Sequence, residues 1–470
     1  MADIFISHSS KTKGNLQKLR RLVELLSSRW NVWSDYTLVG KYSQVIPEEV
    51  RRATCMVPIW THASHSSENV HDELALAKKA RSQIIPVRME DCDAPFGYGT
   101  YSAVDFTDWD GEPNHPALLQ LIRKLEAIVP ATSKPSQPRR VFGDRLELPA
   151  LFMSVSSHET QLAPLPGVQA LRIFGANAVL VSAYDLFPKR RAPGMAAELR
   201  KIRNRGGLVL IDSGNYEASR LGDKKWKPQQ FKRALEGIPH DLAFSFDVMD
   251  PSIGPKQAAK QILEAVTRDS RFTTAPILPI VHARYSEKQK GYVLDSIPTV
   301  IRILAEQLAP PLIAVPEREL GRGLIERAHN VQRIRQELDT LPFYQPLHLL
   351  GTGNPWSIAV LAAAGADSFD GLEWCRVAVD REANRLNHFQ HFDLFTYQIG
   401  WADSPLLAGL LGNDNIDFNA KAAFHNLDYF AQLGKDLRSA AAKGSFEAFV
   451  TSILGSSYKL LAKKMPSLFP

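Results

Sequence analysis

Residues 55–80 read CMVPIWTHASHSSENVHDELALAKKA and decide how the first quarter of the chain folds. The unbroken apolar run at residues 55–60 predicts a buried strand, and the Ser-rich stretch after it predicts a loop. The amphipathic pattern of residues 68–80 predicts a helix with Glu73 in its first half. A strand that leads through a loop into a helix is the unit of parallel α/β sheets, which bind ligands at the carboxyl ends of their strands. We therefore expect Glu73 at a ligand-binding edge.

The segments around Glu73 add polar and aromatic groups to the same expected edge. The positive end of the helix dipole favours an ionised carboxylate at Glu73. A carboxylate beside an aromatic face suits a ligand that carries ribose hydroxyls and a flat cationic ring. The alternative is that Glu73 is an ordinary solvated helix glutamate. The residues expected to contact such a ligand are Ser7, His8, Trp33, Asp35 and Ser67.

The first quarter of the chain resembles a TIR domain. The resemblance rests on DIFISHSS (3–10), VWSD (32–35), VGKYSQVIPEEVRRA (39–53), CMVPIWTHASHSS (55–67), HDELALA (71–77) and IIPVRME (84–90). It implies a flavodoxin-like, doubly wound parallel sheet over residues 1–129. It also implies NAD+ as a substrate that is cleaved at the nicotinamide–ribose bond, with Glu73 at the position of the catalytic glutamate. Enzymatic TIR domains are activated by self-association, so this is expected here as well.

The reaction that this resemblance implies needs little beyond one carboxylate. Nicotinamide is a good leaving group, and its departure leaves an oxocarbenium-like ribose, as in glycoside cleavage. A carboxylate that holds the ribose hydroxyls and faces the positive charge acts by electrostatic preorganisation. No metal is required for this step.

Composition and length set the class of protein. At 470 residues, with 44% hydrophobic and 23% charged residues and a net charge of +6, the chain has the composition of a globular protein of two or three domains. No apolar stretch approaches the roughly 20 residues of a membrane span, so no membrane partner is expected. The three cysteines, Cys55, Cys92 and Cys375, are too widely spaced for a disulfide framework or a Cys-rich zinc site. We expect a cytoplasmic location.

The rest of the chain predicts a linker, a barrel and a tail. Residues 130–145 begin PATSKPSQPRR and are expected to form an exposed linker. Residues 146–380 alternate apolar strand patterns with helical ones, which predicts a TIM-type (β/α)8 barrel. Residues 381–470 are expected to form a helical tail packed on the barrel. The eight predicted strands are residues 150–157, 178–186, 207–214, 242–250, 275–284, 310–317, 346–354 and 367–374.

Polar residues gather where the predicted barrel strands end, and this end is where ligands bind in the fold. They are Asp212, Asp247, His282, Glu317, Asn354, Asp370 and Glu373. Three stretches, IDSGNYE (211–217), AFSFDVMD (243–250) and HLLGTGNPWSIAVLAAAGADSFDG (348–371), resemble tRNA-guanine transglycosylases. The resemblance continues in the helical tail at residues 424–450. It implies that Asp370 is the nucleophile, Asp212 the general base and Asp247 the base-reading residue, with His282 where the family usually has Gln.

The barrel half departs from that family at its metal site. The family holds a structural zinc with three closely spaced cysteines and a histidine. His425 matches the histidine, but residues 376–424 contain no cysteine, so no zinc is expected. His425 is then expected to be a helix-start residue with an ordinary hydrogen bond. Basic runs also occur in this half, and Trp226 inside one of them is a candidate stacking platform for a nucleic acid.

These observations favour an NAD+ glycohydrolase gated by a transglycosylase-like sensor barrel, with a role in bacterial antiphage immunity. The expected trigger is a nucleobase, a nucleotide or a nucleic acid. One alternative makes the barrel an active base-exchange enzyme, with the TIR domain as an oligomerisation scaffold. Another makes the TIR domain a source of a cyclic ADP-ribose signal, since hydrolysis and cyclisation share their first step.

Overall fold

The structure is a computed structural model that describes two compact units. The first consists of residues 1–138 and 339–344, and the second of residues 139–338 and 345–470. Among the described helices, none is long and apolar enough to cross a membrane. Asp35 and residues 130–139 lie outside the described ranges, and the three boundaries between the four segments given above stay a prediction. The described residues are 3–9, 15–27, 29–34, 42–113, 115–129, 140–142, 145–158, 160–402, 408–409, 413 and 415–469.

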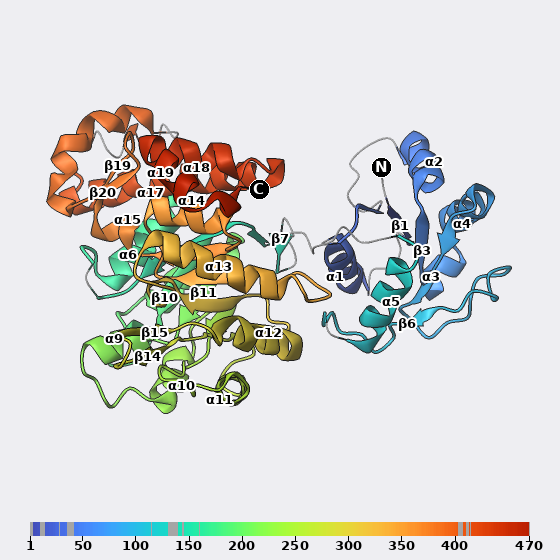
Figure 1. Ribbon diagram of the computed structural model, residues 1–470, viewed down its shortest axis with the longest axis horizontal. Helices are drawn as coiled ribbons and strands as arrows, with labels where there is room; N and C mark the ends of the chain where they lie inside the picture. Colours follow the sequence, from blue (N-terminus) through green and yellow to red (C-terminus); the bar gives the residue numbers. More distant parts are fainter. Residues whose placement is uncertain are drawn as a thin grey trace. The chain divides into compact units, whose positions relative to one another are not determined.

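The first unit is built on a parallel sheet (Figure 1). Its strands are β1 (Ile4–Ser7), β2 (Val32–Ser34), β3 (Cys55–Trp60), β4 (Gln83–Ile84), β5 (Val87–Arg88) and β6 (Val104–Asp105). The order is β2-β1-β3-β5-β6, and β4 also pairs with β3. Every residue of β3 is buried, as its unbroken apolar run predicts. The predicted doubly wound parallel sheet is confirmed.

The helices of the first unit explain where Glu73 points. Val70, Leu74 and Ala77 are fully buried at the spacing of one helix face. Glu73 lies on the same inward face and is only 8% exposed. The interpretation of Glu73 as a solvated glutamate is therefore wrong. The helices are α1 (Leu16–Ser27), α2 (Tyr42–Arg52), α3 (His62–His65), α4 (Glu68–Ala80) and α5 (Pro116–Glu126).

The second unit contains a nearly closed parallel barrel, which confirms the predicted fold class. Its strand order is β13-β12-β11-β10-β9-β18-β17-β16. The circle closes where the Val281 amide donates to the Ala314 carbonyl at 2.8 Å and the Ala314 amide donates to the Pro279 carbonyl at 3.0 Å. The strands are β9 (Ala150–Val155), β10 (Ala178–Ser182), β11 (Leu208–Asp212), β12 (Leu242–Phe244), β13 (Ile277–Leu278), β16 (Ile313–Pro316), β17 (Leu347–Leu350) and β18 (Ser368–Gly371).

Alternate strand residues fill the barrel interior, and helices surround it (Figure 1). Phe152, Leu180, Leu210 and Phe244 belong to one buried cluster inside the ring of strands. Several of the outer helices begin with Pro, whose fixed φ and missing N–H suit the first helical turn. The main outer helices are α6 (Pro164–Phe174), α8 (Met195–Asn204), α10 (Pro228–Leu235), α11 (Pro255–Asp269), α12 (Ile297–Leu308), α13 (Leu324–Leu338) and α14 (Pro355–Ala363).

A short antiparallel hairpin, β7 (Arg140–Val141) and β8 (Leu146–Glu147), precedes the first barrel strand. Val141 and Leu146 are buried in the same cluster as the barrel interior. The segment expected to be an exposed linker, residues 130–145, therefore overlaps a hairpin that packs on the barrel.

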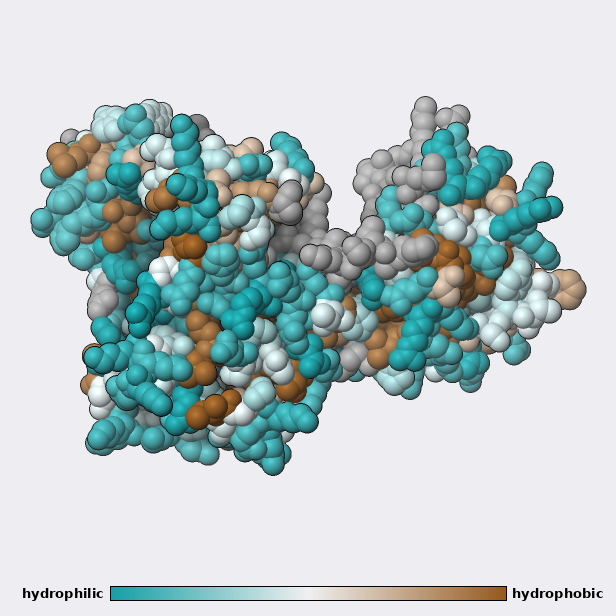
Figure 2. Space-filling view, in the orientation of Figure 1, coloured by the Kyte–Doolittle hydropathy of each residue, from teal (hydrophilic) through white to brown (hydrophobic). Residues whose placement is uncertain are grey.

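The tail packs on the barrel through its first long helix, α17 (Phe418–Lys443). Asn426 is fully buried there and donates to the Trp374 and Val377 carbonyls, which follow the last barrel strand. A short hairpin, β19 (Ala378–Asp380) and β20 (Arg385–Asn387), and the 3-10 segment η3 (Phe389–Trp401) come before α17. The helices α18 (Phe446–Leu454) and α19 (Tyr458–Lys464) complete the tail, drawn in red in Figure 1. On the face drawn in Figure 2, this unit is mostly hydrophilic with separate hydrophobic areas.

Candidate functional sites

The first candidate site is centred on Glu73 at the carboxyl end of β1. The Ser7 hydroxyl, on the last residue of that strand, donates to Glu73 Oε2 at 2.5 Å. Ser7 is 1% exposed, so the hydrogen bond is shielded from water. A short hydrogen bond to a charged acceptor is among the stronger ones in proteins. It fixes one carboxylate oxygen at the edge of the sheet where ligands bind in such folds.

Three of the other four predicted contacts of this site, His8, Trp33 and Ser67, lie among the described residues. His8 follows Ser7 directly and is 7% exposed. Trp33 is half-buried on β2 and stacks on the Phe5 ring, with ring centroids 4.8 Å apart. Ser67 precedes α4 as its N-cap residue, but its side chain makes no capping hydrogen bond. Asp35 falls outside the described residues.

The second candidate site is a cavity of about 250 Å³ at the carboxyl ends of the barrel strands. All four barrel residues predicted to bind a ligand, Asp212, Asp247, His282 and Asp370, line this cavity. They come from four different strands or strand ends, so the closed ring of strands is what brings them together.

Asp370, on β18, is held by three donors or potential donors. Ser154 Oγ donates to its Oδ2 at 2.8 Å, and the Gly351 amide donates to its Oδ1 at 2.9 Å. His348 Nε2 lies 3.3 Å from the same Oδ1. A carboxylate fixed in this way presents a defined oxygen to a ligand rather than rotating freely.

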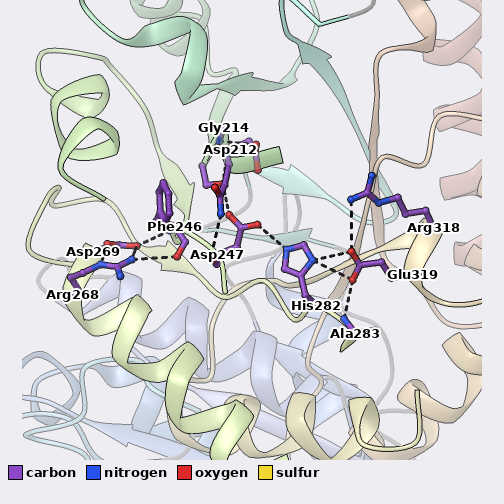
Figure 3. A network of polar contacts seen from close by, with 12 residues as sticks. Asp212, Gly214, Phe246, Asp247, Arg268, Asp269, His282, Ala283, Arg318 and Glu319 are labelled. Carbon is purple, nitrogen blue, oxygen red and sulfur yellow. Dashed lines mark hydrogen bonds and ion pairs between the residues drawn. The ribbon is translucent and has the colours of Figure 1, made fainter. Parts of the chain in front are cut away.

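Asp247, His282 and Glu319 form a buried row of polar groups (Figure 3). His282 Nε2 lies 2.8 Å from Asp247 Oδ2, and His282 Nδ1 lies 3.0 Å from Glu319 Oε1. Burial alone would lower the pKa of His282, but the hydrogen bonds to the two carboxylates raise it to about 10. The ring is therefore an imidazolium at neutral pH and donates to both neighbours.

The imidazolium of His282 also affects the ionisation state of Asp247. Burial would raise the pKa of Asp247, but hydrogen bonds from His282 and from the Ser213 hydroxyl lower it below its ordinary value. Ser213 Oγ donates to Asp247 Oδ1 at 2.6 Å. Trp226 supports this loop, because its indole N–H donates to the Ser213 carbonyl at 3.1 Å. Trp226 is only 3% exposed, so its predicted use as a surface stacking platform is wrong.

Asp212 differs from Asp247 because its neighbours are acidic. Burial, then the charges of Glu217 and Asp247, raise the pKa of Asp212 well above its usual range. Its carboxylate accepts one hydrogen bond, from the Gly214 amide at 3.0 Å. Gly214 has φ +71°, and a Cβ there would lie 2.5 Å from the Tyr184 amide nitrogen, so this turn requires glycine. A carboxyl group whose pKa is raised can serve as a general acid or base.

Two of the seven strand-end residues have other tasks. Asn354 caps α14, because its Oδ1 accepts from the Trp356 and Ser357 amides. Glu317 pairs with Arg327 at 2.8 Å and is not among the residues that line the cavity. Glu319, two positions later, is the residue that contacts His282. Nothing in the spacing distinguishes these two glutamates, since both belong to one 3-10 turn, η2 (Glu317–Glu319).

His425 lies inside α17 and is fully buried. Its Nε2 lies 3.0 Å from the Val379 carbonyl oxygen, which is an ordinary hydrogen bond. The residue is thus the eighth of its helix rather than a helix-start residue. The absence of zinc stays a prediction.

Comparisons with known proteins agree with the division of the chain into two units. Residues 4–122 match the TIR domain family. The chain is 26% identical over 239 residues to the tRNA-guanine(15) transglycosylase of Methanopyrus kandleri, covering 50% of each chain. It is 21% identical over 345 residues to the queuine tRNA-ribosyltransferase of Helicobacter pylori, covering 65% of this chain and 91% of that enzyme. The chain thus spans half the length of the archaeal relative. Residues 4–122 are a TIR domain, and the rest is homologous to tRNA-guanine transglycosylases.

Proposed function

We propose that the TIR domain cleaves the nicotinamide–ribose bond of NAD+, with Glu73 as the carboxylate that faces the ribose. The observation that carries this proposal is the Ser7–Glu73 hydrogen bond at the ligand-binding edge of the sheet. TIR domains of some families cleave NAD+, and the reaction needs one fixed carboxylate opposite the developing positive charge. His8, Trp33, Asp35 and Ser67 are the proposed contacts to the dinucleotide.

The burial of Glu73 favours a gated enzyme. The side chain is only 8% exposed and Ser7 already occupies Oε2, so a dinucleotide needs the site to open before it can reach the carboxylate. We propose that self-association of TIR domains produces the open form. A gate suits an activity that would otherwise drain a cell of NAD+.

We propose that the barrel binds the trigger that controls this opening of the TIR site. An ionised Asp247 and a fixed Asp370 both line its cavity, and carboxylates are natural acceptors for the N–H groups on the edge of a nucleobase. A nucleobase, free or within a nucleotide or nucleic acid, is the proposed trigger. The biological role that follows is antiphage defence by NAD+ depletion in the cytoplasm of a bacterium.

The test is product analysis of the full-length protein with NAD+, with and without added nucleobases or polynucleotides, at several protein concentrations. Nicotinamide release should rise with protein concentration and with the trigger. Glu73→Gln should lower it at least about 10³-fold, since it removes the charge and keeps the shape. Glu68→Gln is the matched control, because Glu68 lies on the same helix and is exposed. Equal activity of Glu73→Gln and the wild type would refute the proposal.

The second candidate is base exchange by the barrel, with the TIR domain as a scaffold. The presence of both Asp370 and Asp212 in one cavity favours it, because one is fixed and the other has a raised pKa. Incorporation of labelled guanine into tRNA or DNA would test it. Loss of incorporation in Asp370→Asn, together with no effect of Glu73→Gln, would favour this candidate. A cyclised ADP-ribose among the NAD+ products would instead identify the TIR domain as a synthase.

A further inference from the structure

A second cavity, the amino-end cavity, lies where the first barrel strands begin. Its volume is about 520 Å³, and its lining includes Ala150 and Ala178, the first residues of β9 and β10. The middle of α17, from Leu427 to Arg438, forms another part of the lining. None of the described residues that line it also lines the cavity at the carboxyl ends of the strands. Pockets for small organic ligands measure about 300–1,000 Å³, so the amino-end cavity has the size of a binding site.

Part of the lining of the amino-end cavity is apolar. Leu151 and Met153 alternate along β9 with Ala150 and Phe152, which belong to the buried cluster inside the barrel. Successive side chains of a strand point to opposite faces, so Leu151 and Met153 point outward. They are only partly buried, although helices form the outer layer of this fold. Phe430 on α17 lines the same cavity, so the apolar part of a ligand would find apolar surface on both elements.

The charged side chains of the amino-end cavity are mostly basic. In the described ranges, four cations and one anion line it: Arg145, Arg205, Lys435 and Arg438, and Glu147. Arg145 has a carboxylate partner of its own, because it donates to Asp241 Oδ1 at 2.8 Å. The remaining three cations share the cavity with the single carboxylate of Glu147, which leaves an excess of positive charge in the lining.

Arg205 binds carbonyl groups rather than a carboxylate. Its Nη2 donates to the Leu171 carbonyl at 3.2 Å and to the Ala176 carbonyl at 2.9 Å. Its Nη1 donates to the Arg172 carbonyl. Burial and the charge of Arg172 lower the pKa of Arg205, and no carboxyl group of the described residues counters them. The positive charge of Arg205 is therefore compensated only by the carbonyl ends of α6.

Arg438 is the cation with the most donors left for a ligand. Its side chain is 28% exposed, and its Nε lies 3.5 Å from Glu147 Oε2. Within the described part of the chain, this long ion pair is the one polar contact of the guanidinium. Burial lowers the pKa of Arg438, and the charge of Glu147 offsets this only in part. A guanidinium whose terminal nitrogens face a cavity can form two parallel hydrogen bonds to one anionic group.

A glycine keeps space for this guanidinium. Gly434 lies inside α17 and is buried, in a position where glycine costs about 0.5–1 kcal/mol relative to alanine. A Cβ there would lie 3.2 Å from Arg438 Nη1 and 3.5 Å from Leu151 Cδ1. The missing side chain thus lets the Arg438 guanidinium lie along the helix, beside the apolar part of the same cavity.

We propose that the amino-end cavity binds a small organic phosphate, with its phosphate group at Arg438 and Arg205 and its apolar part on Leu151, Met153 and Phe430. Lys435, exposed on α17, adds a third positive charge to the lining. A phosphate monoester carries a charge of about −1.5 to −2 at neutral pH, which matches several cations better than one carboxylate does. This site is separate from the sensor function proposed above and does not depend on it.

Calorimetric titration of the full-length protein with phenyl phosphate, inorganic phosphate and benzoate tests the proposal. Phenyl phosphate carries both the apolar ring and the doubly charged group. Inorganic phosphate lacks the ring, and benzoate carries a single charge. The wild type should bind phenyl phosphate at least about tenfold more tightly than either of the other two, which corresponds to about 1.4 kcal/mol.

Four variants locate the binding. Arg438→Gln removes the guanidinium and should weaken binding of phenyl phosphate at least about tenfold. Arg438→Lys keeps the charge without the planar fork and should have an intermediate affinity. Lys435→Gln changes an exposed residue, so the fold is retained, and it should weaken binding by a smaller factor. Lys443→Gln is the matched control and should bind like the wild type, because Lys443 is the exposed last residue of α17 and does not line the cavity.

Two results would overturn the proposal. Equal affinity of the wild type for phenyl phosphate and for inorganic phosphate would mean that the apolar lining is not used. Undiminished affinity in Lys435→Gln and in the Arg438 variants would mean that phenyl phosphate binds elsewhere. The titrations contain neither NAD+ nor a nucleobase, so a failure of the functions proposed above would leave these results unaffected.

Discussion

The TIR domain and the barrel place buried carboxylates in opposite surroundings. In the TIR domain, Glu73 has a neutral hydroxyl, from Ser7, as its hydrogen-bond donor. In the barrel, Asp247 and Glu319 are held by an imidazolium between them, and Asp370 is held by a hydroxyl, an amide and a histidine. The first arrangement places an uncharged donor on one carboxylate oxygen. The second neutralises much of the charge within the protein.

This difference separates a site suited to chemistry from a site suited to recognition. A carboxylate that must stabilise an oxocarbenium-like ribose works best when surrounding dipoles hold it in position before the reaction. A carboxylate that must read the N–H groups of a base works best when its position and its ionised state are fixed in advance. The three variants below test this contrast.

The largest effect is expected from Asp247→Ala. It removes one carboxylate from a buried imidazolium, and breaking a buried ion pair costs about 3–5 kcal/mol. The free energy of unfolding of the barrel should fall by about that amount, measured by calorimetry of the full-length protein. Asp250→Ala is the control, because Asp250 is largely exposed and lies 3.6 Å from Arg284, an arrangement worth little to stability. Equal melting temperatures for the two variants would show that the row is not charged.

A smaller effect is expected from Ser7→Ala in the TIR domain. The change removes one hydrogen bond to a charged group, which contributes about 1.5–3 kcal/mol. Nicotinamide release should therefore fall about 10- to 100-fold, less than in Glu73→Gln. Ser7→Thr, which keeps the hydroxyl, should retain more activity than Ser7→Ala. Full activity of Ser7→Ala would mean that Glu73 is positioned by other groups.

The smallest effect per pH unit concerns His282. Its pKa is raised from an ordinary 6.5 to about 10, so its stabilising effect is complete below pH 6.5 and is lost as the pH rises toward 10. The loss cannot exceed about 1.4 kcal/mol per pH unit for one proton. The free energies of unfolding of the wild type and of His282→Gln, measured with urea between pH 6.5 and 10, should converge as the pH rises. A difference in free energy of unfolding that stays constant over this pH range would contradict the charged state of His282.

The sequence predicted both folds because their signals are local. The apolar run at residues 55–60 gave β3, and the eight apolar runs of the second unit each contain a barrel strand. Glu73 could be placed beside a strand edge, but its inward direction followed only from the buried face of Val70, Leu74 and Ala77. The helix pattern contains this information, since Glu73 lies three residues after Val70.

Other features of the site depend on contacts between distant residues. Glu319 lies 37 positions from His282, and no spacing rule connects them. The polar strand-end pattern selected Glu317 instead, whose partner Arg327 is four residues into α13. Sequence patterns therefore located the mouth of the barrel but not which of its carboxyl groups carry compensating charge.

The way the barrel closes has a mechanical consequence. Strands β10 and β11 are joined over five paired positions, whereas β13 and β16 meet through the single bridge between Ile280 and Ala314. The barrel should open locally at the junction between β13 and β16 first, because local opening is easiest where the fewest backbone hydrogen bonds join two strands. Ile280 and Pro316 line the cavity at the carboxyl ends of the strands from the two sides of this junction. A ligand that contacts both residues would hold the two strands together. It should slow hydrogen exchange at the Val281 and Ala314 amides and leave the exchange rates of the strands on the opposite side of the barrel unchanged.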